Sequence, residues 1–132
     1  MAIIIDADVI IRGERGNFDL NHWISAQTEE LELAAITVAE LWHGVERATA
    51  PHRARRETYI RTILDGVAVV PYTQATAFEH ARIWAAAEAS GNTMGPYDAI
   101  VAATAVERGS TLATFNKRHF AKIDRLKVFE PK

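Results

Sequence analysis

The sequence predicts an α/β fold with a mainly parallel central sheet and helices on both faces. Short apolar segments alternate with longer segments of helical spacing in the order β-α-α-β-α-α-β-α-α-β-α-β, the pattern of parallel strands joined by helical crossovers. The first segment, Ile3-Ile4-Ile5, shows no alternation of apolar and polar residues, so we expect it to be buried on both faces. With 132 residues and 48% hydrophobic content, the chain is predicted to form one domain, residues 1–132, with a substantial core.

Five segments are predicted to be strands, because each is short, mostly apolar and flanked by turn or helix-start residues. They are residues 2–6, 31–36, 67–70, 111–113 and 127–129. Pro71 closes the third segment, since proline cannot continue the hydrogen-bond ladder of a central strand.

Helices are predicted between these strands, where apolar residues recur every three or four positions. They comprise a short helix from Asp6 to Gly13 or Gly16, residues 18–27, 37–49, 51–65, 73–90 and 96–108, and a short helix before the last strand. Pro51 and Pro96 suit first helical positions, and Gly91 and Gly109 follow last ones.

The third predicted helix begins with a local capping motif. Thr37-Val38-Ala39-Glu40 has the form of a capping box, with Thr37 as the N-cap and Glu40 at the third helical position. On local sequence alone, capping is the favoured role for Glu40. The same placement puts the Glu40 carboxylate just past a strand end, where a site would be built.

Four acidic residues, Asp6, Asp8, Glu40 and Asp98, fall at strand ends or in first helical turns. Any one of them is readily explained by a helix N-terminus, which favours carboxylates. Their recurrence in three separate segments favours a shared site over coincidence. Because like charges repel, such a cluster needs a proton or a cation to be stable.

Composition excludes several other kinds of chemistry. There is no Cys, so disulfides, thiolate catalysis and Cys-based zinc sites are excluded. The five histidines show no pairing four residues apart that would suit a zinc site on a helix. No segment has the form of a signal peptide or the length of a membrane span, so we expect a cytoplasmic protein with no membrane partner.

Charge is distributed unevenly although the net charge is only −2. Residues 1–46 hold nine acidic and two basic side chains, whereas residues 108–132 hold two acidic and seven basic ones. Five arginines also gather on one segment, at positions 47, 53, 55, 56 and 61. An acidic centre with basic surroundings suits a metal-dependent phosphodiesterase. The charge pattern alone favours the simpler interpretation, in which these arginines solvate helix faces.

The acidic segments, taken together, resemble the PIN-domain ribonucleases, in particular the VapC-like toxins of type II toxin–antitoxin modules. The matching pieces are Ile5–Val9, Ile36–Arg47, Gly95–Ala103 and Gly109–Phe120. Each piece alone is a weak match, but the ordered set spans nearly the whole chain and is specific. The resemblance implies a PIN-like three-layer fold with a parallel five-stranded sheet.

The resemblance also implies a metal-dependent endoribonuclease that hydrolyses RNA and inhibits growth or translation. Asp6 and Asp98 correspond to the principal ligands of Mg²⁺, or of Mn²⁺ in its place. Glu40 falls at the family's second acidic position. The fourth acidic position falls on Asn116, whose amide carries no charge, so the number of bound metals stays open. Asp8 stands where the family more often has Asn or Ser, and its charge is expected to replace part of what Asn116 lacks.

In this hypothesis the catalytic set is Asp6, Glu40, Asp98 and Asn116. A bound metal lowers the pKa of a water and neutralises phosphate oxygens, and Glu40 positions or deprotonates the attacking water.

Basic residues beside the acidic motifs are candidates for binding the RNA. They are Arg12, Arg15, Lys117 and Arg118. The partners implied by the resemblance are an RNA substrate, a small cognate antitoxin and a second copy of the chain in a homodimer.

Three alternatives arise at the level of sequence. The Asp6-Ala7-Asp8 motif also suits a haloacid-dehalogenase-type phosphatase, but the first lysine is Lys117 and no further acid pair follows Asp98. A receiver domain would need a phosphate-accepting aspartate at the third strand, and residues 67–72 contain none. The other alternative is a catalytically weakened PIN-like module that binds RNA or a partner, because Asn116 replaces an acid.

Overall fold

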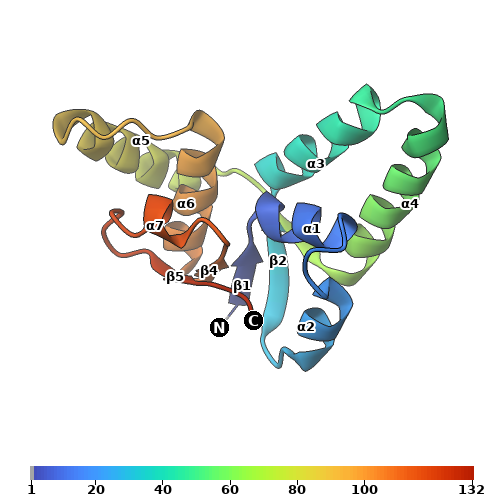
Figure 1. Ribbon diagram of the computed structural model, residues 1–132. Coiled ribbons are helices and arrows are strands. Elements are labelled where there is room, and N and C mark those ends of the chain that lie inside the picture. The colour runs from blue at the N-terminus through green and yellow to red at the C-terminus, as the bar shows by residue number, and fades with distance from the viewer. Residues whose placement is uncertain (1) are drawn as a thin grey trace.

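A five-stranded parallel sheet forms the centre of the computed structural model, which describes residues 2–132. The strand order is β3-β2-β1-β4-β5, and every neighbouring pair is parallel. The strands are β1 (Ala2–Ile5), β2 (Glu30–Ala34), β3 (Ala68–Val70), β4 (Thr111–Ala113) and β5 (Lys127–Phe129). The α/β fold predicted from the sequence is therefore confirmed (Figure 1).

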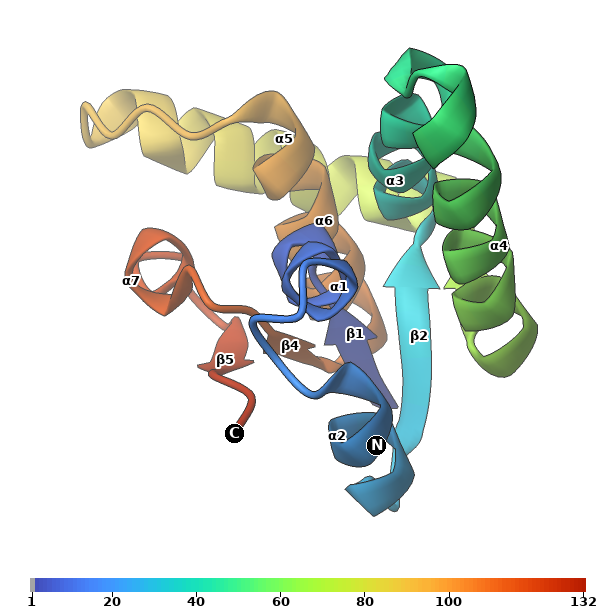
Figure 2. The same cartoon turned by 45° about the vertical axis from the view of Figure 1, so that its right-hand side comes forward.

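Helices cover both faces of the sheet (Figures 1 and 2). One face carries α1 (Ala7–Glu14), α2 (Leu20–Ala26), α3 (Ala35–Arg47) and α4 (Ala50–Gly66), and the other carries α5 (Gln74–Ala89), α6 (Pro96–Arg108) and α7 (Lys117–Phe120). The alternation of β1 explains the two layers. Ile3 and Ile5 enter the core cluster under α1 to α4, whereas Ile4 enters the cluster under α5 to α7.

The connectivity creates a switch point between β1 and β4. The chain builds outward from β1 through β2 to β3, then returns to the opposite side of β1 to form β4 and β5. In open parallel sheets, ligands bind outside the carboxyl ends of the strands at such a point. Asp6 follows β1 there, and its N–H donates to the carbonyl of Ala113 at the end of β4, 2.9 Å away.

The predicted capping box at Thr37 is wrong. The ladder of β2 ends where Ala34 pairs with Val70, the last residue of β3, so the chain enters α3 at Ala35. Thr37 therefore lies inside the helix, fully buried, and the N-cap position is Ala34, which provides no side-chain hydrogen bond. Glu40 falls in the second helical turn, so capping does not explain its position.

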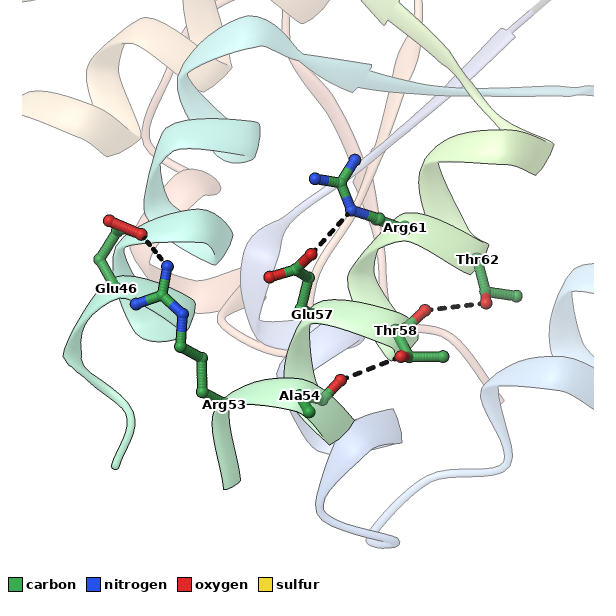
Figure 3. A network of polar contacts seen from close by, with 7 residues as sticks. All are labelled: Glu46, Arg53, Ala54, Glu57, Thr58, Arg61 and Thr62. Atoms are coloured by element: carbon green, nitrogen blue, oxygen red, sulfur yellow. Dashed lines mark hydrogen bonds and ion pairs between the residues drawn. The ribbon is translucent and has the colours of Figure 1, made fainter. Parts of the chain in front are cut away.

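The arginines of α4 are mostly neutralised locally. Arg53 pairs with Glu46, Arg61 pairs with Glu57, and Arg56 pairs with Glu14 on α1. Figure 3 shows the first two pairs on the outer surface of α3 and α4. The simpler interpretation of this arginine segment, as a solvated helix face, therefore fits the structure.

None of the helices within residues 2–132 combines the length and apolar character needed to cross a bilayer.

An ion pair between a buried carboxylate and a partly exposed arginine joins the sheet to α6 at the edge opposite the switch point. Glu32 on β2 is 3% exposed, and Arg108 at the end of α6 donates to its two carboxylate oxygens, at 3.0 and 2.7 Å. Gly109 then ends α6 in the left-handed conformation, with φ of 67°. This bidentate geometry compensates the burial of the Glu32 carboxylate.

We expect Arg108→Leu to destabilise the fold by roughly 1–3 kcal/mol, because Glu32 would remain buried without its partner. The double variant Glu32→Leu/Arg108→Leu should recover most of that loss. Urea denaturation at pH 7 measures both free energies of unfolding. Equal stability of the single variant and the wild type would contradict this role for the pair.

Candidate functional site

Acidic side chains from three helices gather at the carboxyl ends of the central strands. Asp6 is the N-cap of α1, Asp98 lies in the first turn of α6, and Glu40 lies in the second turn of α3. They are close enough that the charges of Asp6 and Asp98 both raise the pKa of Glu40. The structure thus brings together three acids that are 34 or more positions apart in the sequence.

Asp6 is the most deeply buried of these acids, with 7% of its surface exposed. One carboxylate oxygen accepts from the Ala7 N–H at 2.9 Å, and the other accepts from the Thr114 hydroxyl at 2.8 Å. Burial and the neighbouring Asp8 charge raise the pKa of Asp6 to about 6, although these hydrogen bonds oppose the rise. Asp6 is therefore held rigidly in an environment that disfavours its negative charge.

Glu40 carries an unsatisfied oxygen. Its Oε1 atom is buried and has no hydrogen-bond partner in the described part of the chain. Burial, together with the charges of Asp6 and Asp98, raises the pKa of Glu40 to about 7. A buried acceptor without a partner is costly, so this position favours either a proton or a cation.

Asp98 lies against His119. The Nε2 atom of His119 is 3.2 Å from Oδ2 of Asp98, and both side chains are about one third exposed. Burial raises the pKa of Asp98, and the contact with His119 opposes that rise. Gly95, the N-cap of α6, lies close beside the carboxylate, since a Cβ atom there would be 3.4 Å from Oδ2.

Asp8 has a different role from the one its charge suggests. Its carboxylate accepts from the Phe115 N–H at 3.1 Å and lies 3.3 Å from the Thr114 hydroxyl, so it ties α1 to the segment after β4. The Asp8 charge still raises the pKa of Asp6. Because a hydroxyl has one proton, Thr114 cannot donate to Asp6 and Asp8 at once. The shorter distance, to Asp6, identifies the principal bond.

Asn116 stands at the N-cap position of α7 but makes no side-chain capping bond. Its backbone N–H donates to the Thr114 hydroxyl at 3.0 Å, and the residue is exposed. The fourth position of the predicted catalytic set is thus linked to Asp6 through Thr114.

The four predicted RNA-binding residues lie on α1, which Asp6 caps, or at its end, and on α7, which follows Asn116. Arg12 and Arg15 are exposed at the end of α1, and Lys117 and Arg118 are exposed on α7. The guanidinium of Arg12 lies 4.3 Å from the centre of the Phe115 ring, which fixes its direction beside Asp8.

Thr114 and His119 are functional contacts to which the sequence analysis assigned no role. Thr114 is fully buried although polar, and it follows β4 directly. The sequence signal that could have identified Thr114 is its position directly after a predicted strand and two residues before Asn116. The partnership of His119 with Asp98 is a long-range contact for which no local pattern exists.

The donor set suits a magnesium-like cation, although no ligand cage is preassembled. Within residues 2–132, no three His, Asp or Glu side chains are arranged to hold a metal ion as they stand. Magnesium usually takes only one or two carboxylates and keeps several waters, so three direct ligands are not required. No Lys or Arg forms an ion pair with Asp6, Glu40 or Asp98 in the described chain. A cation would therefore relieve repulsion that only the contact of His119 with Asp98 relieves in part.

Comparisons with known proteins identify similar chains. Residues 3–126 match the PIN domain family. The chain is 33% identical to VapC ribonuclease Y4jK of Sinorhizobium fredii, over 98% of this chain and 99% of that protein. It is 29% identical to Ribonuclease VapC1 of Rickettsia felis, over 97% and 95% of the two chains. The fold is similar to that of a chain in VapBC2 from Rickettsia felis bound to a DNA fragment from their promoter, with a TM-score of 0.90, 18% identity and full coverage of both chains.

The raised pKa of Glu40 predicts how stability depends on pH. Folding raises this pKa from the ordinary value of 4.5 to about 7, so the folded protein retains a proton that the unfolded chain has released. The stability contributed by Glu40 is therefore fully present below pH 4.5 and is lost as the pH rises through 7. In chelator, Glu40→Gln should be close to wild type at pH 5 and more stable by on the order of 1–2 kcal/mol at pH 8.

Urea denaturation at both pH values measures this difference, with the exposed Glu29→Gln as a control that should show none. If Glu40→Gln is less stable than the wild type at pH 8, the proposed repulsion is absent.

Proposed function

Because the chain belongs to the PIN-domain family, and within it to the VapC ribonucleases, we propose that it is a metal-dependent endoribonuclease and the toxin of a bacterial toxin–antitoxin pair. One observation carries the proposal beyond family membership. Three acids from separate segments lie close enough for their charges to interact, and one buried oxygen of Glu40 has no partner. Such a group is suited to bind a divalent cation.

The family membership excludes the phosphatase and receiver-domain alternatives. A toxin of this family would act on RNA in the cytoplasm and be held inactive by a small cognate antitoxin. We propose the same partners here, together with a homodimer. These proposals rest on the VapC ribonucleases to which the chain is similar and on the motifs it shares with them.

In the proposed mechanism, Asp6 and Asp98 hold the metal, with Mg²⁺ as the expected ion and Mn²⁺ as a substitute. A bound divalent cation supplies a water of lowered pKa and neutralises charge that develops on the phosphate. Thr114 keeps the Asp6 carboxylate in one orientation through its 2.8 Å hydrogen bond. Asn116, whose backbone is linked to Asp6 through Thr114, is proposed to orient a water as an uncharged acceptor.

Glu40 is proposed to orient the attacking water and accept its proton. Without a cation, burial and the charges of Asp6 and Asp98 raise the pKa of Glu40 to about 7. That pKa would fall beside a cation held by Asp6 and Asp98, so the Glu40 carboxylate would be available to accept a proton at neutral pH. Its buried oxygen without a partner is the atom placed to accept a hydrogen bond from that water. Arg12, Arg15, Lys117 and Arg118 are proposed to contact phosphates of the RNA.

The second candidate is a PIN-like module that binds RNA or a protein partner without cutting. The replacement of the fourth acid by Asn116 favours it, since one negative charge at the site is missing. Cleavage assays separate the two candidates.

We expect Asp98→Asn to reduce metal-dependent RNA cleavage by roughly 10²–10⁴-fold, because it removes a charged ligand while preserving shape. Asp65→Asn, an exposed acid on α4, is the matched control and should cleave at the wild-type rate. Cleavage is measured on single-stranded RNA at pH 7.5 with Mg²⁺ and with excess chelator. Cleavage that persists in chelator, or in Asp98→Asn, would overturn the proposal.

A further inference from the structure

A groove extends from the candidate site, past Asn116 and Arg118, to residues that the proposed mechanism does not use. Its walls are the second half of α5, the segment 90–94 that follows it, and the segment from Asn116 through α7 to residue 124. Figure 2 shows α5 and α7 on the same side of the molecule, beside α6. One end of the groove is lined by Asn116 and His119, and His119 contacts Asp98 at 3.2 Å. The groove therefore opens onto the candidate site.

The cations of this groove are the feature that distinguishes it. Arg82, Arg118 and Lys122 line it, against a single acid, Asp124. Arg82 is engaged by Glu79 at 2.8 Å. Arg118 is exposed and forms no ion pair within residues 2–132, and the Nζ atom of Lys122 lies 3.4 Å from the amide oxygen of Asn92. Two cations thus remain available for an anionic ligand.

The other lining residues favour a nucleic-acid backbone over a protein segment. The apolar lining is small or partly covered: Ile83 is 3% exposed, and Met94 and Ile123 are half-buried. A docking peptide needs apolar pockets for anchor residues, whereas a phosphate backbone needs spaced cations and polar groups. The exposed aromatic Trp84 lines an adjoining hollow that shares Asn92 and Met94 with this groove but contains neither Arg118 nor Lys122.

We propose that this groove binds the phosphate backbone of single-stranded RNA on one side of the cleaved bond, with Arg118 and Lys122 contacting successive phosphates. Asn92 positions the Lys122 ammonium through the contact between their side chains. This inference rests on the proposed function and adds a path for the substrate. It enlarges the set of RNA-binding residues by Lys122 and Asn92.

The test measures RNA binding in the Asp98→Asn background, so that the labelled single-stranded RNA stays intact. Arg118→Ala/Lys122→Ala is compared with Arg47→Ala/Arg55→Ala, which removes two exposed cations from α3 and α4 on the opposite face of the sheet. Fluorescence anisotropy is recorded from 50 to 300 mM KCl, and a labelled acidic peptide is titrated in parallel.

The groove variant should bind RNA about 10–100-fold more weakly at low salt, and the slope of log affinity against log salt should fall by on the order of 0.7 per lost contact. The α3/α4 control should keep the parental slope. Equal losses in both double variants would overturn the proposal, because the effect would then be a general one of charge. Loss of peptide binding with unchanged RNA binding would also overturn it and assign the groove to a protein segment.

The two proposals fail in distinguishable ways. One outcome is that the wild type cleaves RNA while the groove variant binds RNA with the parental affinity and the parental salt dependence. In that case the groove proposal is wrong and the nuclease proposal stands. If wild type does not cleave RNA but the groove variant alone loses binding, the groove stands and the nuclease proposal fails.

Discussion

Repulsion among Asp6, Glu40 and Asp98 is the constraint on which the rest of the site depends. The fold fixes it, because β1 and β4 are neighbours at the switch point and core clusters on both faces of the sheet hold α1, α3 and α6 in place. Within residues 2–132 no Lys or Arg pairs with these acids, so their charge is relieved by protons, by the contact of His119 with Asp98, or by a cation. A site with this property gains stability when it binds a divalent metal.

A second set of contacts holds Asp6 and its neighbours in place. Thr114 is buried beneath Asp6 and also receives the backbone N–H of Asn116, while Asp8 accepts the backbone N–H of Phe115. These bonds fasten α1 to the start of α7 and hold the Asp6 and Asp8 carboxylates in place. Asp8 therefore contributes to the site as a structural anchor and as a negative charge close to Asp6. Such preorganisation is what a metal site needs from its surroundings.

The sequence predicted the strands, the parallel sheet and the acids at the sheet edge, because buried strands and strand-end acids are local patterns. The capping box at Thr37 failed because the pairing of Ala34 with Val70, a long-range contact, decides where β2 ends. The bonds of Thr114 to Asp6 and of His119 to Asp98 join distant segments, so no window of sequence contains them. The assignment of roles to Asp6, Glu40, Asp98 and Asn116 is a prediction that the geometry supports.

The central claim is that one divalent cation binds between Asp6 and Asp98 with Glu40 facing it. Anomalous diffraction from crystals grown with Mn²⁺ tests this most directly, because the signal locates the metal independently of any cleavage assay. We expect a single strong anomalous peak that lies within coordination distance of carboxylate oxygens of both Asp6 and Asp98. Crystals of Asp98→Asn should show no peak at this position. Crystals that contain Mn²⁺ elsewhere on the protein but show no peak between Asp6 and Asp98 would contradict the account.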